Sequence, residues 1–325
     1  MFMKIKKILI ILGEPQSIFS EILFKYFNSK EFSKNKKKII LIGSSKLIQN
    51  HMRKLKIKLK IKLKIIKYVK ESKINKLNIL NINYNNKKIF SKISSNSTKY
   101  ISNCFKIALS IIKNNKKIVL INGPISKRYF LKNKYLGVTE YISKKTKSKN
   151  PVMLIYNDKF SVSPITTHLP LKYVAKNITK QKIIMNVKEI NKFYLNSLNK
   201  KPKIAILGLN PHCETIDKID EEKKIITPAI NFLKKKNLRI DGPFPADTFF
   251  LKKNTNIYDV VVGMYHDQVL TPLKTLYNFN AINLTLGLPF IRISPDHGPN
   301  EKMMGKNISD PSSIFCAMRF INKIR

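Results

Sequence analysis

The sequence predicts an α/β fold built on a mainly parallel β-sheet, in which apolar strands alternate with helices. Short runs rich in β-branched residues recur along the 325-residue chain, and longer segments with helical character separate them. Strands that are apolar throughout are typical of parallel sheets covered by helices. A chain of this length is also sufficient for two domains. The expected strands cover 6–12, 37–43, 117–123, 151–156, 203–209 and 258–265, and the clearest helices cover 20–27 and 227–237.

The first expected strand follows lysines and so superficially resembles a secretory signal. Its apolar run is too short for that role and ends in Gly-Glu-Pro instead of a small-residue cleavage site. No stretch reaches the roughly 20 apolar residues that a membrane-spanning helix needs. Cys104, Cys213 and Cys316 are far apart and form no C-x-x-C pair, which indicates a reducing compartment. We therefore expect a cytoplasmic protein with no membrane partner.

A lysine-rich segment follows the second expected strand. Residues 55–67, LKIKLKIKLKIIK, alternate between lysine and aliphatic side chains. This period of two predicts a half-buried strand with one lysine face. Nucleic acid could lie on that face, but an exposed edge strand guarded by lysines is the commoner arrangement. Polar stretches at 84–100 and 144–150 are expected to be loops, and the second is expected near a domain boundary.

The chain is strongly basic, with 63 Lys and Arg against 19 Asp and Glu and a net charge of +44. Such an excess can indicate a nucleic-acid or anionic-membrane partner. Here the basic residues are mostly lysine and are spread along the chain, together with many Ile and Asn, which also have A/T-rich codons. This pattern favours compositional drift and a solvated surface. We expect no specific nucleic-acid partner.

Three of the five histidines follow expected strands or apolar stretches. His212 comes after KIAILGLNP, His266 after DVVVGMY, and His168 lies in the turn-rich segment SPITTHLPL. Ligands of open parallel sheets bind beyond the carboxyl ends of the strands. Three imidazoles delivered there could hold one divalent metal and leave positions open for a substrate oxygen. Taken singly, each histidine has an alternative role as a cap or a hydrogen-bonded core residue.

Neighbouring charged residues add to this hypothesis. Asp267 could orient the His266 ring by accepting its second N–H. Asp247, in GPFPADT, is either a helix N-cap or a carboxylate that transfers a proton. Arg292 lies in an apolar run and therefore needs an anionic partner, which is either Asp296 or a substrate carboxylate or phosphate.

Several motifs together resemble the 4-hydroxythreonine-4-phosphate dehydrogenase family. They occur in the family order with compatible spacing and span most of the chain, most clearly from about residue 117 onward. Any one of them alone would be a weak signal. They are GPISK (123–127), TTHLPL (166–171), LNPH (209–212), GPFPADT (242–248), MYHDQ (264–268) and NLTLGLPFIRIS followed by DHG (283–298).

The resemblance implies an NAD- or NADP-dependent oxidation in pyridoxal 5′-phosphate biosynthesis that requires a divalent metal. The 3-hydroxyl of 4-phosphooxy-L-threonine becomes a ketone, and loss of CO₂ gives 3-amino-2-oxopropyl phosphate. The implied fold has two α/β/α domains around a central cleft, as in isocitrate and isopropylmalate dehydrogenases. Residues 1–125 with 285–325 would form the cofactor-side domain, and 126–284 would carry the metal and substrate motifs and the dimer interface. The implied assembly is a homodimer whose subunits share the active site.

The resemblance also assigns roles to residues. The family's metal ligands fall on His168, His212 and His266, and its substrate contacts fall on Thr139, Lys274, Asn283 and Arg292. Asp247 or Lys274, the latter in the TPLKT loop, is the expected proton acceptor or donor. His297, in DHG, resembles a cofactor-side loop. Three imidazoles suit Zn²⁺ or Co²⁺, while substrate oxygens also admit Mg²⁺ or Mn²⁺. Because no G-x-G-x-x-G is present, NAD and NADP both stay open.

The sequence departs from the family pattern at three places. Val138 stands where the family has a histidine in Gly-His-Thr-Glu, and the stretches 13–21 and 213–222 lack family glycines. Loss of glycine removes positive-φ conformations and close backbone approach, so we expect these loops to differ in shape. Two alternatives therefore stay open. One is a sister dehydrogenase for another phosphorylated hydroxy acid, and the other is a non-catalytic remnant of the fold.

Overall fold

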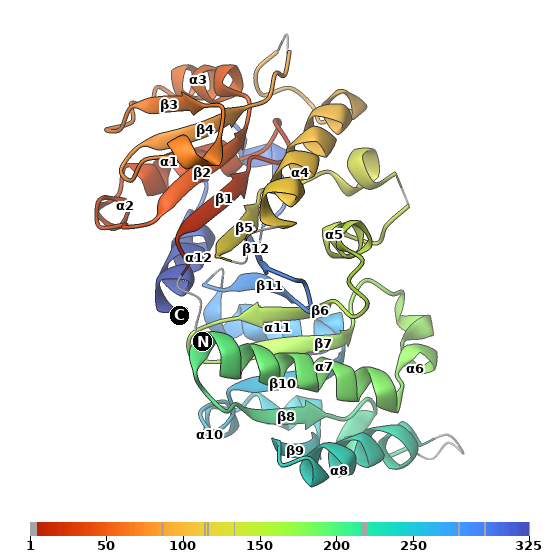
Figure 1. Ribbon diagram of the computed structural model, residues 1–325. Coiled ribbons are helices and arrows are strands. Elements are labelled where there is room, and N and C mark those ends of the chain that lie inside the picture. The colour runs from red at the N-terminus through yellow and green to blue at the C-terminus, as the bar shows by residue number, and fades with distance from the viewer. Residues whose placement is uncertain are drawn as a thin grey trace. The chain divides into compact units, whose positions relative to one another are not determined.

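The computed structural model describes residues 5–85, 88–113, 115, 117–132, 134–215, 220–278, 280–295 and 297–324. The chain divides into two compact units, each of α/β type (Figure 1). Unit 1 comprises Met3–Thr146 and Leu288–Arg325, and unit 2 comprises Lys147–Gly287. Residues 126–146, which the sequence analysis assigned to the second domain, cluster with unit 1.

Unit 1 is built on parallel strands in the order β3-β4-β2-β1-β5-β12. The expected strands at 6–12, 37–43 and 117–123 are confirmed as β1, β2 and β5, and the expected helix at 20–27 is confirmed as α1. The strands are β1 Lys7–Ile11, β2 Lys38–Gly43, β3 Leu63–Ile66, β4 Leu77–Asn81, β5 Ile118–Asn122 and β12 Ile291–Pro295. The helices are α1 Phe19–Phe27, α2 Lys30–Ser33, α3 Ser45–Lys54, α4 Thr98–Lys113, α5 Val138–Thr146 and α12 Ser312–Lys323.

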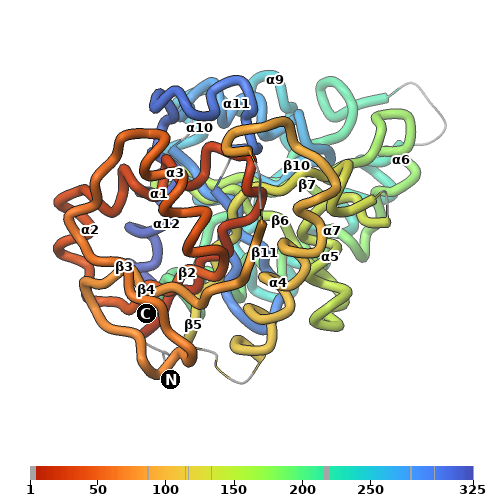
Figure 2. Tube along the Cα trace, turned by 90° about the horizontal axis from the view of Figure 1, so that it is seen from above, coloured from red at the N-terminus to blue at the C-terminus, as the bar shows by residue number. Residues whose placement is uncertain are grey.

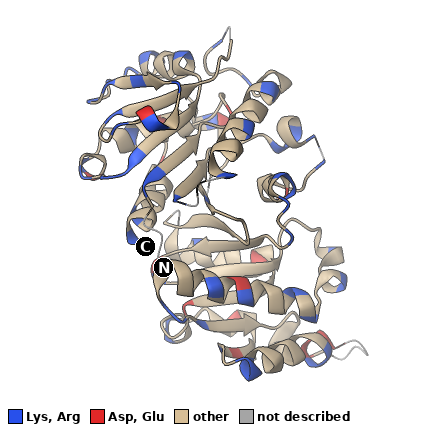
Figure 3. Cartoon of the chain, in the orientation of Figure 1, with Lys and Arg blue, Asp and Glu red and all other residues tan. Residues whose placement is uncertain are grey.

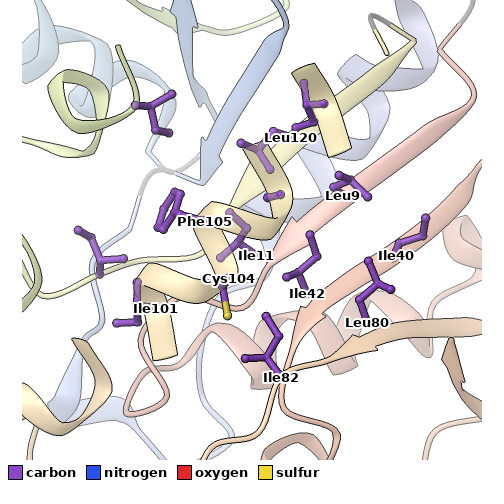
Figure 4. Close-up of a cluster of buried hydrophobic side chains, with 14 of the residues drawn as sticks. Leu9, Ile11, Ile40, Ile42, Leu80, Ile82, Ile101, Cys104, Phe105 and Leu120 are labelled. Atoms are coloured by element: carbon purple, nitrogen blue, oxygen red, sulfur yellow. The ribbon is translucent and has the colours of Figure 1, made fainter. Parts of the chain in front are cut away.

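One face of this sheet packs against α4. Aliphatic side chains of β1, β2 and β4 meet Ile101, Cys104 and Phe105 of that helix in a buried cluster (Figure 4). Cys104 is fully buried, and burial raises the pKa of its thiol to about 12. A thiol this hard to ionise is a poor nucleophile, so Cys104 serves as a core residue.

The lysine-alternating segment forms a much shorter strand than expected. Only Leu63–Ile66 of residues 55–67 is extended, as β3 at the edge of the sheet order. Helix α3 continues to the start of the segment, and Lys56 then adopts a left-handed conformation with φ 54°. The amide of Asn28 donates to the carbonyl of Lys58 at 2.9 Å and holds the intervening loop. The period of two predicted the edge strand but not where it starts.

Unit 2 has a mixed sheet in the order β11-β6-β7-β10-β8-β9. The strands are β6 Val152–Tyr156, β7 Ser161–Thr166, β8 Lys203–Leu207, β9 Arg239–Phe244, β10 Val260–Tyr265 and β11 Ile282–Leu286. The helices are α6 Val174–Asn177, α7 Lys180–Phe193, α8 Thr227–Lys235, α9 Ala246–Phe249, α10 Lys252–Thr255 and α11 His266–Tyr277. These confirm the expected strands at 151–156, 203–209 and 258–265 and the expected helix at 227–237. Helix α7 packs on β6 and β7 (Figures 1 and 2).

The expectation of a parallel sheet holds for β7, β10, β8 and β9 and is wrong for β6. Strand β6 pairs antiparallel with both β7 and β11. The physical reason lies in the connection, because only residues 157–160 separate β6 from β7. A parallel pair needs a crossover of roughly a dozen residues, so this short link forces a hairpin.

Lysine and arginine are distributed over the elements of both units without forming a single arm (Figure 3). Among the described residues, no helix has both the length and the apolar character needed to cross a membrane.

Candidate functional site

The three site histidines follow three neighbouring parallel strands of unit 2. Strand β10 lies between β7 and β8, so the carboxyl ends of all three meet at one edge of the sheet. His168 comes two residues after β7, His266 directly follows β10, and His212 lies five residues after β8. This is the edge at which ligands bind in open α/β sheets.

His168 and His266 lie close together at this edge. Their ring centroids are 6.0 Å apart, and the His266 side chain is 35% exposed. Nδ1 of His266 lies 2.6 Å from Oδ1 of Asp267. Because a carboxylate can only accept a hydrogen bond, this contact places the imidazole proton on Nδ1 and leaves the Nε2 lone pair available. The contact is the one by which Asp267 could orient the His266 ring, and its role beside a metal stays a prediction.

His212 is exposed on the loop after β8, and it does not form a three-residue metal cluster with His168 and His266 within the described part of one chain. Among the described residues, no cluster of three or more His, Cys, Asp or Glu side chains is arranged to hold a metal ion. One copy of the chain therefore brings two of the three predicted ligands together. Two adjacent imidazoles, one of them held by a carboxylate, fit a divalent metal in kind and leave its other positions to further ligands.

The loop that carries His212 has an unusual backbone held by a buried glutamate. His212 and Cys213 both adopt left-handed conformations, with φ of 57° and 61°, which is uncommon for residues other than glycine. Oε1 of Glu222, a residue only 2% exposed, accepts from the backbone N–H groups of Leu209 at 2.7 Å and Asn210 at 2.9 Å. The loss of glycine after His212 is thus accommodated by a strained turn that Glu222 supports.

The two predicted proton-transfer residues lie on helices. Asp247 is exposed in the first turn of α9, whose N-cap is Pro245 without any side-chain cap, so the N-cap alternative is wrong. Lys274 was expected in a loop, but it lies inside α11. It follows His266 by eight residues, which corresponds to about 12 Å along a helix axis. In one chain, Lys274 is therefore well separated from the helix end that carries His266.

Asn283, a predicted substrate contact, projects from β11. Its Oδ1 atom is buried and has no hydrogen-bond partner among the residues that the structure describes. A buried acceptor left unpaired costs about 1–3 kcal/mol, so such atoms call for an explanation. A donor on a bound ligand is one physical reason to keep an amide at this position.

In unit 1, two further predicted substrate residues contact each other. Arg292, on β12, is 2% exposed and donates from Nε to Oδ1 of Asn122 at 2.8 Å and from Nη1 to Oγ1 of Thr139 at 3.0 Å. Burial lowers the pKa of Arg292 to about 10, against which the charge of Glu140 acts. The guanidinium thus stays charged at neutral pH. Asp296, the alternative partner, lies outside the described residues.

The sequence departures in unit 1 have simple structural correlates. Val138, in place of the family histidine, packs against the core cluster of unit 1. In the stretch 13–21 only Gly13 has a positive φ, of 72°, so Ser17 and Phe19 replace glycines without left-handed strain. Phe19 is fully buried and lies with its ring centroid 5.9 Å from that of His297. A cofactor role for His297 stays a prediction.

The fold is of the α/β type seen in isocitrate dehydrogenases. An isocitrate dehydrogenase from Methylococcus capsulatus superposes with a TM-score of 0.52 over 98% of this chain and 85% of that one, at 10% identity, which shows the fold alone. The family model of pyridoxal phosphate biosynthetic protein PdxA matches residues 35–321. The chain belongs to the PdxA family.

Curated relatives and solved structures support this membership. A 4-hydroxythreonine-4-phosphate dehydrogenase from Sulfurihydrogenibium sp. (strain YO3AOP1) is 39% identical over 96% of each chain. The protein of the same name from Aquifex aeolicus (strain VF5) is 34% identical over 98% of each chain. The crystal structure of 4-hydroxythreonine-4-phosphate dehydrogenase from Klebsiella pneumoniae has a TM-score of 0.83 at 26% identity and covers 98% of each chain.

Proposed function

We propose that this chain is a metal- and NAD-dependent dehydrogenase that oxidises 4-phosphooxy-L-threonine and releases CO₂ to give 3-amino-2-oxopropyl phosphate. The reaction is a step of pyridoxal 5′-phosphate biosynthesis. The observation that carries the proposal is the pairing of His168 with His266 at the carboxyl edge of unit 2, with Asp267 orienting the second ring. Family membership and relatives up to 39% identical that bear this name add support.

The metal would be held by His168 and His266, with His212 as the third ligand. A divalent cation in this place lowers the pKa of a bound hydroxyl and stabilises negative charge on oxygen. The imidazole set suits Zn²⁺ or Co²⁺, and Mg²⁺ is compatible if substrate oxygens complete the coordination. Because His168 and His212 are exposed and His266 is partly exposed, solvent ions can reach the three rings.

The other residues have roles set by charge and hydrogen bonding. A bound NAD would supply the acceptor for the hydride that oxidation removes from the substrate carbon, and Asp247 or Lys274 would accept the hydroxyl proton. Arg292, held by Asn122 and Thr139, would neutralise the substrate phosphate or carboxylate. The buried Oδ1 of Asn283 would accept a hydrogen bond from the substrate.

We also propose a homodimer in which two subunits share the active site. In support, one copy of the described chain groups only two imidazoles, and Lys274 lies two helical turns from His266. A second copy would supply the missing groups. The predictions of a cytoplasmic location and of NAD or NADP as the cofactor belong to this proposal as well.

The experiment is an assay of NADH formation from 4-phosphooxy-L-threonine after chelation and after adding back Zn²⁺, Co²⁺ or Mg²⁺. We expect activity only with metal and a loss of at least 100-fold in His212→Ala. Asn199→Ala is the matched control, because Asn199 is also exposed and left-handed, with φ 52°, but precedes β8 at the opposite end of the strand. Activity that survives both chelation and His212→Ala would refute the proposal.

A second candidate is a sister dehydrogenase for another phosphorylated hydroxy acid, such as a four-carbon phospho-sugar acid. Val138 favours it, because its side chain packs into the core beside Thr139 where the family has a polar imidazole. The same assay with both substrates separates the two candidates by their kcat/KM values. A metal-loaded protein that turns over neither substrate would instead be a non-catalytic remnant of the fold.

A further inference from the structure

We propose that Gln268 is a positioning residue that ties together the three histidine-bearing segments of unit 2 and so sets the metal affinity of the site. The inference rests on the proposed function, since it takes His168, His212 and His266 as metal ligands. Gln268 is 8% exposed and lies in the first turn of α11, two residues after His266.

The side-chain amide of Gln268 joins two different strand ends. Its Oε1 accepts from the backbone N–H of Met264 at 2.7 Å, and its Nε2 donates to the carbonyl of Gly208 at 2.8 Å. Met264 lies two residues before His266, and Gly208 lies four residues before His212. The amide therefore links the segment that delivers one histidine to the segment that delivers another.

The link lies where the strand pairing ends. The parallel register between β10 and β8 runs to Val262 opposite Ile206, and two residues further along it would set Met264 opposite Gly208. The Gln268 amide bridges these two backbone groups in place of a direct hydrogen bond. A capping box at the start of α11 would pair Gln268 with the backbone N–H of the N-cap, Tyr265, whereas its Oε1 accepts from Met264. The bond to Gly208, sixty residues away in sequence, is not explained by capping.

The third segment joins at the same residue. Oγ1 of Thr166 donates to the carbonyl of Met264 at 2.7 Å, and Thr166 lies two residues before His168. Both backbone groups of Met264 are thus held by side chains, one from Gln268 and one from Thr166. The backbone segments that precede His168, His212 and His266 are consequently joined by one hydrogen-bonded junction.

Two glycines make room for this junction. A Cβ atom at Gly263 would lie 2.8 Å from Oε1 of Gln268 and 2.4 Å from Val269, so only glycine lets the amide fold back onto β10. A Cβ atom at Gly208 would lie 2.6 Å from Sγ of Cys213 and 3.0 Å from Oε1 of Glu222. Glycine at this position lets the His212 loop turn back onto the end of β8.

Groups that hold metal ligands in place typically contribute about 10- to 100-fold to metal affinity. We expect Gln268→Met, which keeps the side-chain volume and removes both hydrogen bonds, to weaken Co²⁺ binding by at least 10-fold. The readouts are calorimetric titration of the metal-free protein with Co²⁺ and the visible absorption of the bound ion, and neither depends on turnover. Should Gln268→Met fail to fold, Gln268→Asn keeps a polar amide that is too short to bridge both partners.

The matched control is Asn186→Leu. Asn186 is another buried amide of unit 2, and on α7 it exchanges hydrogen bonds with the Ser163 hydroxyl, away from the histidine-bearing loops. Both substitutions replace a buried amide by an apolar group of similar size. We expect Asn186→Leu to change thermal stability as Gln268→Met does and to leave Co²⁺ affinity within about 3-fold of the wild type.

A double variant separates this inference from the proposed function. If Gln268 acts through His212, Gln268→Met should have little further effect on Co²⁺ binding in a His212→Ala background. Wild-type Co²⁺ affinity in Gln268→Met, together with weakened binding in His212→Ala, would overturn the role of Gln268 and leave the metal site standing. Unchanged binding in His212→Ala would instead overturn the metal site itself, and the role of Gln268 with it.

Discussion

Arg292 offers the sharpest test of how unit 1 contributes to substrate binding. Its guanidinium is 2% exposed and fixed by hydrogen bonds to Asn122 and Thr139. The perturbation is Arg292→Met, which keeps an unbranched apolar stem and removes the charge. If the charge neutralises a substrate anion, KM should rise while kcat changes little, because such contacts are similar in the ground and transition states.

The expected changes in KM and in the free energy of unfolding follow from the burial of the Arg292 guanidinium. A charge-assisted contact to a phosphate or carboxylate is worth about 2–4 kcal/mol here, which corresponds to a rise in KM of roughly 30- to 1000-fold. Burial lowers the pKa of Arg292 from 12.5 to about 10, a penalty on the charged form of about 3 kcal/mol. Removing the charge relieves that penalty and also removes the hydrogen bonds to Asn122 and Thr139, at about 1–3 kcal/mol each. These opposing contributions predict a small change in the free energy of unfolding beside a large change in KM.

The assay measures KM and kcat between pH 7 and 9, where Arg292 remains charged, and unfolding by urea on the same preparations. Arg319→Met is the matched control, because Arg319 is exposed in unit 1 and pairs with Glu31 at 2.7 Å. Arg292→Lys should fall between the wild type and Arg292→Met, since an ammonium keeps the charge but not the planar fork. A KM within 3-fold of the wild type in Arg292→Met would remove this residue from the binding site.

Two further predictions concern the pH dependence of folding. Burial raises the pKa of Glu14 to about 7 from 4.5, so the fold favours the protonated carboxyl, and this stabilisation is present below pH 4.5 and lost as pH rises through 7. Glu14→Gln should therefore gain about 3 kcal/mol relative to the wild type between pH 4.5 and 8, and a constant difference in urea unfolding would contradict this. Burial lowers the pKa of His51 to about 4 from 6.5, so the fold excludes the protonated ring and loses stability as pH falls from 6.5 to 4. Between pH 6.5 and 4 the free energy of unfolding of His51→Leu should fall by about 3 kcal/mol less than that of the wild type. An equal fall in both proteins, measured by urea unfolding, would disprove this.

Most of the strands that the sequence predicted contain a continuous apolar run, such as residues 8–11 of β1. Strand β7 reads SVSPIT, and its serines and Pro164 conceal a strand that is nonetheless almost entirely buried. Helix α11 was not predicted, because Pro272 interrupts the helical pattern at a cost of about 3 kcal/mol and its TPLKT stretch was expected to be a loop. Burial of Val269, Leu270 and Leu273 in the core of unit 2 offsets that cost, which no local pattern reveals.

The candidate site was predictable where it follows from chain topology. A histidine just after an apolar strand can be placed at the carboxyl edge of a parallel sheet without knowing any contact, and this rule brought His168 and His266 to one edge. Asn122, Glu222 and Gln268 could not be found in this way. Each acts by holding a backbone or side chain from a distant part of the sequence, and such partners emerge only when the chain is folded.

The division of the chain into units has a consequence for synthesis on the ribosome. Unit 2 occupies one continuous stretch, Lys147–Gly287, whereas unit 1 needs both the first 146 residues and the last 38. Strand β12 and helix α12, which complete unit 1, leave the ribosome after unit 2. Domains generally fold as soon as they are translated. Unit 2, with His168, His212 and His266, should therefore fold on the nascent chain before unit 1 receives β12 and its Arg292. Termination of synthesis before β12 would release a folded unit 2 with an incomplete unit 1.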